Sequence, residues 1–450
     1  MNFTVFGILI IGLQVLCLGI AFIASRSQST RTDYYLAGRS MPFFPLLMTF
    51  VATQVGGGLI LGSAENAYHF GWEIVFYPLG AISGFFLLAT FLGRRLAALP
   101  VSTVAQIFEY SYGSKTLKQI ASLLSILTLF MITVAQVIAS QKFLLAVGIN
   151  HPIWFFAFWA VVFVYTMWGG MSGIASIDVV QASFFILVFA AALIEMLSAG
   201  SLGQLELSKL SASETVDSST LVSWFLMPCL FILIEQDMAQ RCFSARTPQI
   251  VKRAAIGSAV IIFLICIVPI SFGLLGKMSG TAVPEGHSAF MTLVQTLTSP
   301  TMAAAVACAV MMAIISTAVS LIHSISSNLT QDFWTKEESA TKQLLVSRLV
   351  TLLVGFAALL VSSYFSDIVG VLIQSYELSV ACLFVPVLMS LLKKQHGPMP
   401  ATLAIVFGAC TFFLFRVFDA PIPKEIIELL ASSFGFALGT LTTKRAEATC

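Results

Sequence analysis

The sequence predicts an all-α polytopic membrane protein with about 13 transmembrane helices. Apolar residues make up 58% of the 450 residues and charged residues only 10%, and the mean hydropathy is +0.95. A soluble chain of this length needs far more charge to cover its surface. Runs of about 20 apolar residues recur from end to end, and each is long enough to cross the hydrocarbon core as a helix.

The predicted spans follow one another with short polar connections. They cover residues 3–25, 42–64, 70–93, 119–146, 153–170, 174–199, 221–240, 251–276, 300–328, 344–364, 368–392, 399–418 and 426–442. The first span is too long for a signal-peptide core and no convincing cleavage site follows it, so we expect it to be retained.

Basic residues predict the orientation. With the N-terminus outside, 18 of the 23 Lys and Arg residues fall on the inner side, Arg241 among them. The other 5, which include Arg416 and Lys424, fall on the outer side. This asymmetry favours an outside N-terminus and a cytoplasmic C-terminus in the plasma membrane, or inner membrane of a bacterium.

Several classes of function are disfavoured. A net charge of +2 gives no reason to expect a nucleic-acid partner. The eight cysteines are scattered and form no CxxC pair, so neither a zinc site nor a disulfide framework is predicted. There is no HExxH or GxSxG motif, and we expect no enzymatic activity. Membrane lipid and a small-molecule solute are the expected partners, and no oligomeric state is predicted.

The second span contains a glycine run that predicts an interruption. Gly56, Gly57 and Gly58 are consecutive, and each glycine costs up to ~1 kcal/mol in a helix. In lipid, such a break is tolerated where it lines a cavity, and broken helices bind substrates and ions in many secondary transporters. The alternative is close helix packing through Gly58 and Gly62, a small-xxx-small contact.

The seventh span is also predicted to be interrupted. Pro228 precedes an apolar run that ends in Glu235, Gln236 and Asp237. The two interrupted spans open two sets of five, and an odd number of spans per set inverts the second set in the membrane. We therefore expect a leading helix (1–41), two inverted five-helix repeats (42–199 and 221–392) and two trailing helices (393–450).

Polar residues inside spans are the candidate ion ligands. Asp178 near the start of the sixth span suits an ion-related or a capping role. Ser316 and Ser320 lie one turn apart beside Thr317, and their oxygens suit a small cation or simple bonds to the i−4 carbonyl.

Two further ionisable residues are less informative. We expect His323 to be packed rather than a metal ligand, and Glu377 suits either a proton carrier or a structural acid.

Three segments together resemble the sodium:solute symporter family. Residues 33–39 (DYYLAGR) are similar to that family's first signature, and residues 166–181 are similar to its T-x-x-GG-x-x-x-V-x-x-x-D-x-x-Q stretch. Ser316-Thr317 followed by residues 328–332 (NLTQD) resembles its ST/SS…D pattern. The resemblance implies the leucine-transporter fold with one preceding and two trailing helices.

The resemblance also implies ion sites. Sodium would be held by the carbonyls of Ala52, Val55 and Ala313 with the hydroxyls of Ser316 and Thr317. Some members have a further sodium site, which would involve Asp178 and Ser320 here. Val319 stands where that second site takes a hydroxyl, so the second ion is in question.

Within the family, the stretch from Ala52 to Gly58 resembles the choline transporter branch, whose comparable segment reads ATWVGGG. Gln54 replaces the tryptophan of that segment, and Glu235 stands where another cage tryptophan would align. Loss of two rings that surround a quaternary ammonium argues against choline itself and favours a polar solute, including one that carries an amine. The expected substrate-binding residues are Gln54, Gly56, Gly57, Leu59, Tyr77, Gln136 and Glu235.

The predicted function is sodium-coupled uptake of a small polar organic solute by alternating access, with Na+ as coupling ion and no organic cofactor. Two alternatives remain: a proton-coupled transporter that uses Asp178 or Glu377, and a membrane sensor with a transporter-like core.

Overall fold

The computed structural model describes residues 1–149, 151–198, 216–284, 288–334, 339–364, 368–392, 397–418 and 423–449. This part of the chain folds into helices joined by short turns, with an isolated β-bridge between Met41 and Ala245. The helices are α1 Phe3–Ser25, α2 Arg31–Leu36, η1 Ala37–Arg39, α3 Phe43–Gln54, η2 Gly58–Gly62, α4 Ser63–Phe70, η3 Gly71–Val75, α5 Phe76–Leu87, η4 Leu88–Leu92, α6 Gly93–Ala97, α7 Val104–Tyr112, α8 Lys115–Ala146, α9 Pro152–Ser198, α10 Ser218–Phe231, α11 Gln236–Ser244, α12 Pro248–Ser279, α13 Ala289–Leu297, α14 Pro300–Asp332, α15 Ala340–Val361, η7 Ser362–Tyr364, α16 Ile368–Ser379, η8 Val380–Phe384, α17 Val385–Leu392, α18 Pro398–Val417 and α19 Lys424–Thr449.

Local sequence signals account for where the long helices begin. Ser299 caps α14 by accepting a hydrogen bond from the backbone of Met302, and Pro300 occupies the first turn, where no backbone N–H is needed. Thr247 and Pro248 start α12 in the same way. These caps satisfy backbone donors that the helix itself leaves free.

Among the described residues, eleven helical segments are long and apolar enough to span a membrane. Helix α9 is 47 residues long and bends at Gly170, whose φ of 54° interrupts the helical backbone. It contains the predicted span 153–170 and the described part of the predicted span 174–199. The short α3 and the segment Gly58–Ala97 hold the second and third predicted spans. The fold class is confirmed, whereas the count of thirteen stays a prediction.

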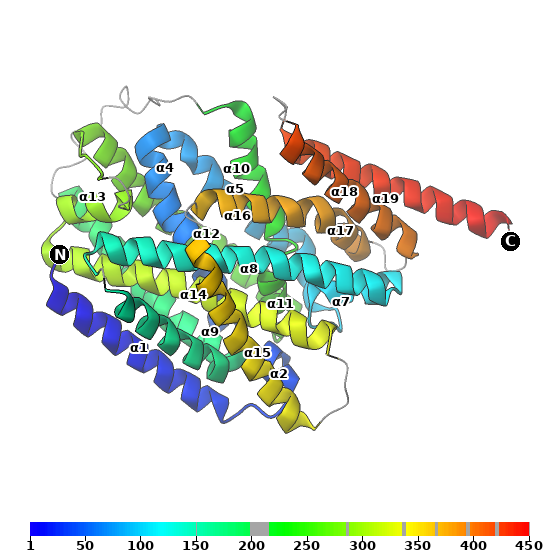
Figure 1. Cartoon of the computed structure of the whole chain (residues 1–450), viewed down its shortest axis with the longest axis horizontal. Helices are drawn as coiled ribbons and strands as arrows, with labels where there is room; N and C mark the ends of the chain where they lie inside the picture. Colours follow the sequence, from blue (N-terminus) through cyan, green and yellow to red (C-terminus); the bar gives the residue numbers. More distant parts are fainter. Residues whose placement is uncertain are drawn as a thin grey trace.

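Helix α14 lies at the centre of the molecule. In its most apolar stretch, 94% of the residues are buried, against 22% for α1. It packs against α8, α9 and α15, and in Figure 1 it runs between α1 on one side and the α18–α19 hairpin on the other. The hairpin helices pack on each other and against η8.

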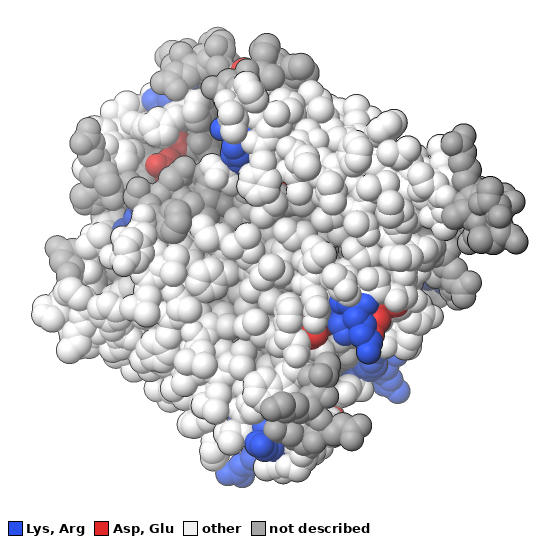
Figure 2. Space-filling view, turned by 45° about the vertical axis from the view of Figure 1, so that its right-hand side comes forward, with Lys and Arg blue, Asp and Glu red and all other residues white. Residues whose placement is uncertain are grey.

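The outer surface suits a lipid environment. The face in Figure 2 is almost wholly uncharged, and its Lys, Arg, Asp and Glu side chains gather in a few small groups. Large apolar side chains such as Leu187, Ile194 and Leu353 are about two-thirds exposed. A surface of this kind is stable when hydrocarbon chains cover it.

Candidate functional site

The predicted interruption of the second span lies directly after α3. Helix α3 ends at Gln54, and Val55 leaves helical geometry with φ −85° and ψ 78°. The backbone N–H of Gly57 donates to Oε1 of Gln136 on α8, at 2.8 Å. A neighbouring helix thus satisfies a backbone group that the break frees.

Close approach explains why glycine occupies this turn. A Cβ on Gly56 would lie 2.6 Å from Oγ1 of Thr317, and one on Gly57 would lie 2.8 Å from Cβ of Ala139. A Cβ on Gly58 would lie 2.5 Å from Leu372. The run therefore serves both proposed roles, because it breaks the helix and also lets other elements pack against the backbone.

Four of the five predicted sodium ligands meet at this break. The hydroxyl of Ser316 donates to the carbonyls of Ala52 (2.7 Å) and Ala313 (2.9 Å). The hydroxyl of Thr317 lies 3.4 Å and 3.2 Å from the same two oxygens. The result is a buried cluster of uncharged, hard oxygen atoms, which is the donor chemistry that small cations such as sodium prefer.

The fifth predicted ligand, Val55, lies three residues beyond Ala52 at the end of α3 and is fully buried. The Ser316 and Thr317 hydroxyls do not bond to it among the described contacts. Instead, Thr317 donates to the carbonyl of Thr53 at 2.9 Å, a residue that the sequence did not single out. The helix ends between Thr53 and Val55, so the carbonyls near the break no longer share one direction.

Arg241 occupies the region predicted for a second ion. Its side chain is 1% exposed, and its guanidinium donates to the Thr49 hydroxyl (2.8 Å) and the Asp237 carbonyl (3.0 Å). It also bonds to the Ser320 hydroxyl and lies 3.6 Å from Oδ2 of Asp178. A permanent cation therefore already sits between the two residues predicted to hold the ion.

The charge count took Arg241 as one of the basic residues on the inner side. The structure buries its side chain, since α11 packs against α3 and α14. Thr49 connects Arg241 to Asp178, because its hydroxyl accepts from the guanidinium and donates to the Asp178 carboxylate. Val319 is buried beside Ser320 and has no side-chain oxygen.

The seventh span is also broken, as its sequence predicted. Helix α10 ends at Phe231 and α11 begins at Gln236, with a non-helical turn between them. Glu235 follows this turn and is 8% exposed. Asp237 is buried one residue into α11, and its Oδ2 has no hydrogen-bond partner among the described residues.

A small cavity lies between the two breaks. Its volume is about 30 Å³, and of the seven predicted substrate residues all but Gly57 line it. Gly57 is held just behind the wall by Gln136. The remaining lining residues are Thr53, Gly58, Ile132, Thr317, Leu372 and Tyr376. Thr53 and Thr317 thus belong both to this wall and to the oxygen cluster.

Of the two aromatic residues in the wall, Tyr77 was predicted from the sequence and Tyr376 was missed. Tyr376 stacks on Phe231, with ring centroids 4.5 Å apart. Tyr376 lies in an apolar span, so only the fold brings it to the cavity, with Phe231 packed behind it. Leu372 reaches the cavity from the same helix, α16.

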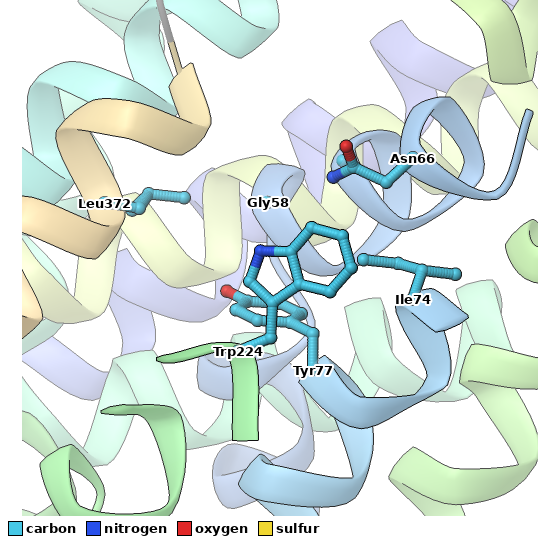
Figure 3. Close-up of a pocket in the computed structure, with 7 residues that line it drawn as sticks. Gly58, Asn66, Ile74, Tyr77, Trp224 and Leu372 are labelled. Atoms are coloured by element: carbon cyan, nitrogen blue, oxygen red, sulfur yellow. The ribbon is translucent and has the colours of Figure 1, made fainter. Parts of the chain in front are cut away.

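A second, smaller cavity adjoins the first. Gly58, Tyr77 and Leu372 line both, and the second is completed by Gly62, Asn66, Ile74 and Trp224. In Figure 3, Leu372 extends from α16 toward Gly58, while Trp224 and Tyr77 lie on the opposite side. The three shared residues form a constriction between the two spaces.

The structure also places the two ionisable residues that the sequence left open. His323 is buried, and its ring lies 5.1 Å from the rings of Tyr34 and Tyr35, as expected for a packed residue. Glu377 is fully buried and ion-paired with Arg416 and Lys424, away from the cavity.

Two interrupted apolar helices that line one polar cavity, with a buried oxygen cluster at the first break, are the arrangement of a secondary transporter. The sodium:solute symporter family model matches residues 34–408, and the chain belongs to this family. It is accordingly an integral membrane transporter that couples movement of a small molecule to sodium.

Individual relatives agree with this class. The chain is 24% identical over 366 residues to the sodium/pantothenate symporter of Haemophilus influenzae, covering 75% of each chain. Its fold is similar to a Na+-coupled sialic acid symporter solved in a substrate-bound outward-open state, with TM-score 0.78, 17% identity and 97% of each chain covered.

A second solved structure has a related fold. Mhp1, a nucleobase-cation-symport-1 family transporter in a closed conformation, gives TM-score 0.63 at 16% identity, covering 94% of this chain and 96% of that one. These likenesses confirm the leucine-transporter type of fold. The finer resemblance to the choline branch stays a prediction.

Proposed function

We propose that this chain imports a small organic solute with a positively charged nitrogen, such as an amino acid, a betaine or an amine, together with sodium. The observation that carries the proposal is Glu235 in the wall of the central cavity. Asp178, Glu235 and Asp237 are all buried near one guanidinium, that of Arg241. Carboxyl groups in excess over basic ones favour a cationic ligand.

Coupling of sodium to solute follows from the residues that the oxygen cluster and the cavity wall share. Sodium bound by Ser316, Thr317 and the carbonyl of Ala52 would fix the turn after α3, and this turn carries Gln54 and Gly56 into the cavity. An ion that stabilises the substrate-ready state raises substrate affinity, and the substrate must raise ion affinity to the same extent. The cavity must widen before a solute can enter, because about 30 Å³ corresponds to a single water molecule or little more.

The basic residues support an outside N-terminus, which puts Asn66 and Trp224 on the outer side of the constriction. Solute would then enter past Gly58, Tyr77 and Leu372 and leave toward the cytoplasm.

Uptake into proteoliposomes tests the function. Radiolabelled amino acids, betaine, choline and polyamines are offered with an inward sodium gradient and with no gradient. Accumulation of one of them only with sodium supports the proposal. Uptake that ignores sodium and stops with a proton uncoupler would instead establish proton coupling, and binding without accumulation would establish a sensor.

Replacing the cavity acid should change specificity. We expect Glu235→Gln to weaken uptake of a cationic solute about 10- to 100-fold, because a charge-assisted hydrogen bond contributes roughly 1.5–3 kcal/mol. Half-saturation of uptake by solute is the measurement. Glu109→Gln, at a part-exposed ion pair with Lys118, is the control. An unchanged half-saturation in Glu235→Gln would show that the solute does not contact this acid.

One sodium ion should accompany each solute, because Arg241 already fills the region between Asp178 and Ser320. The expected sodium dependence of uptake is hyperbolic, with a Hill coefficient of about one. Parallel measurement of labelled sodium and labelled solute gives the ratio directly. A ratio of two would mean that a second ion binds despite the guanidinium.

A further inference from the structure

A second group of buried charges lies outside the transport site, where α16 meets the α18–α19 hairpin. Glu377 on α16 is fully buried. Its Oε2 lies 2.8 Å from the Arg416 guanidinium of α18 and 3.2 Å from the Lys424 ammonium of α19. Both basic side chains are about one-third exposed, so they reach from the surface inward.

Two more carboxyl side chains, both from α19, belong to this group of buried charges. Glu425 and Glu428 are 2% and 1% exposed, and Glu428 interacts with both Glu377 and Glu425. One oxygen of each acid is buried without a hydrogen-bond partner in the described part of the chain: Oε1 of Glu377, Oε2 of Glu425 and Oε1 of Glu428.

Three carboxyl groups thus face two basic groups. Leaving an extra carboxylate buried among like charges is costly, and two adjacent carboxyls relieve the cost by sharing a proton. A metal ion is the other way to balance the charge, but no group of His, Cys, Asp and Glu in the described residues has the arrangement of a metal site. In the described part of the chain, the thiol of Cys382 lies near Glu428, and the thiol of Cys410 lies near Cys382.

We propose that this cluster is a proton-binding site, in which one proton shared by Glu377 and Glu428 holds α19 against α16. The proton comes from bulk water, and its binding turns one carboxylate into a carboxylic acid that donates to the other. The unpartnered oxygens of both residues then have a partner. Loss of the proton at high pH leaves two carboxylates in contact and drives the hairpin away from α16.

The site shares helix α16 with the wall of the cavity. Tyr376, the residue before Glu377, lies in the cavity wall and stacks on Phe231. The π-helical segment η8 begins three residues further on, and the hairpin packs tightly there, since a Cβ on Gly408 would lie 2.0 Å from the Ala381 carbonyl. Protonation therefore acts on the helix that contributes Leu372 and Tyr376 to the cavity wall.

Infrared difference spectroscopy tests the proposal on the full-length protein in phosphatidylethanolamine–phosphatidylglycerol vesicles. In sodium-free potassium chloride, raising the pH should remove a carboxylic-acid carbonyl band from the wild-type spectrum. Glu428→Gln should lack this band, Glu428→Asp should keep it at a shifted frequency, and the control Glu109→Gln should keep it unchanged. Circular dichroism identifies any variant that has not folded. If Glu428→Gln does not fold, the spectrum of the conservative Glu428→Asp decides whether the band belongs to this residue.

Two results would overturn the site. A pH-sensitive band that survives unchanged in both Glu428 variants would place the proton elsewhere. A band that disappears when sodium replaces potassium would mean that the cluster holds sodium instead. The measurement uses no transported solute, so its outcome is independent of the proposed transport function.

Discussion

Sodium-dependent uptake is expected to fall to background in the double variant Ser316→Ala, Thr317→Ala. The two hydroxyls are the side-chain members of the buried oxygen cluster at the break after α3. Each contact with a charged partner contributes roughly 1.5–3 kcal/mol, so losing both should weaken sodium binding by at least about 100-fold. The sodium concentration for half-maximal uptake is the measurement, with the single variants showing intermediate shifts.

Ser327→Ala is the matched control, because it removes a buried hydroxyl from the same helix that pairs with Gln331 and not with α3. It should transport as the wild type does. Wild-type sodium dependence in the double variant would remove Ser316 and Thr317 from the ion site altogether.

Removing the buried guanidinium of Arg241 should lower the free energy of unfolding by roughly as much as the double variant weakens sodium binding. Arg241→Met leaves Asp178 without its cation and leaves the Asp237 carbonyl without its guanidinium donor. Breaking a buried pair from one side costs roughly 3–5 kcal/mol, because a charge stays buried and uncompensated. Unfolding in mixed detergent micelles measures the loss, and Arg94→Met at an exposed position should leave stability close to that of the wild type.

The pair can be separated from its surroundings by a double-mutant cycle. Asp178→Asn combined with Arg241→Met removes both charges and should recover part of the stability lost in the single arginine variant. Strictly additive losses would mean that the two groups do not interact, and that the second-ion argument built on Arg241 fails.

The sequence predicted the fold class and both helix breaks because each has a local signal. Lipid forces backbone groups to pair within helices, so the glycine run after Gln54 and the polar residues after Pro228 stand out against apolar spans. The sequence pattern alone could not identify Ser316 and Thr317 as ion ligands, since hydroxyls in membrane helices commonly bond to the backbone of their own helix. The family resemblance implied that they bind sodium, and their contacts with the Ala52 carbonyl independently place them at the break.

The rest of the site depends on tertiary contacts. Leu372 and Tyr376 line the cavity from an apolar helix, where nothing in the sequence distinguishes them from lipid-facing residues. Arg241 was counted with the solvated charges because positive residues near span ends usually lie in water. Only the packing of α11 against α3 and α14 shows that this one is buried.

The nearly complete burial of α14 limits how this protein can evolve. A helix with a lipid-facing side can accept neutral substitutions there, and over generations its sequence drifts. Helix α14 has almost no such side, and its run of Ala, Ser, Cys and Met leaves little spare volume for larger residues. Change in this helix therefore requires compensating change in α8 or α9, whereas the exposed side of α1 can diverge without it.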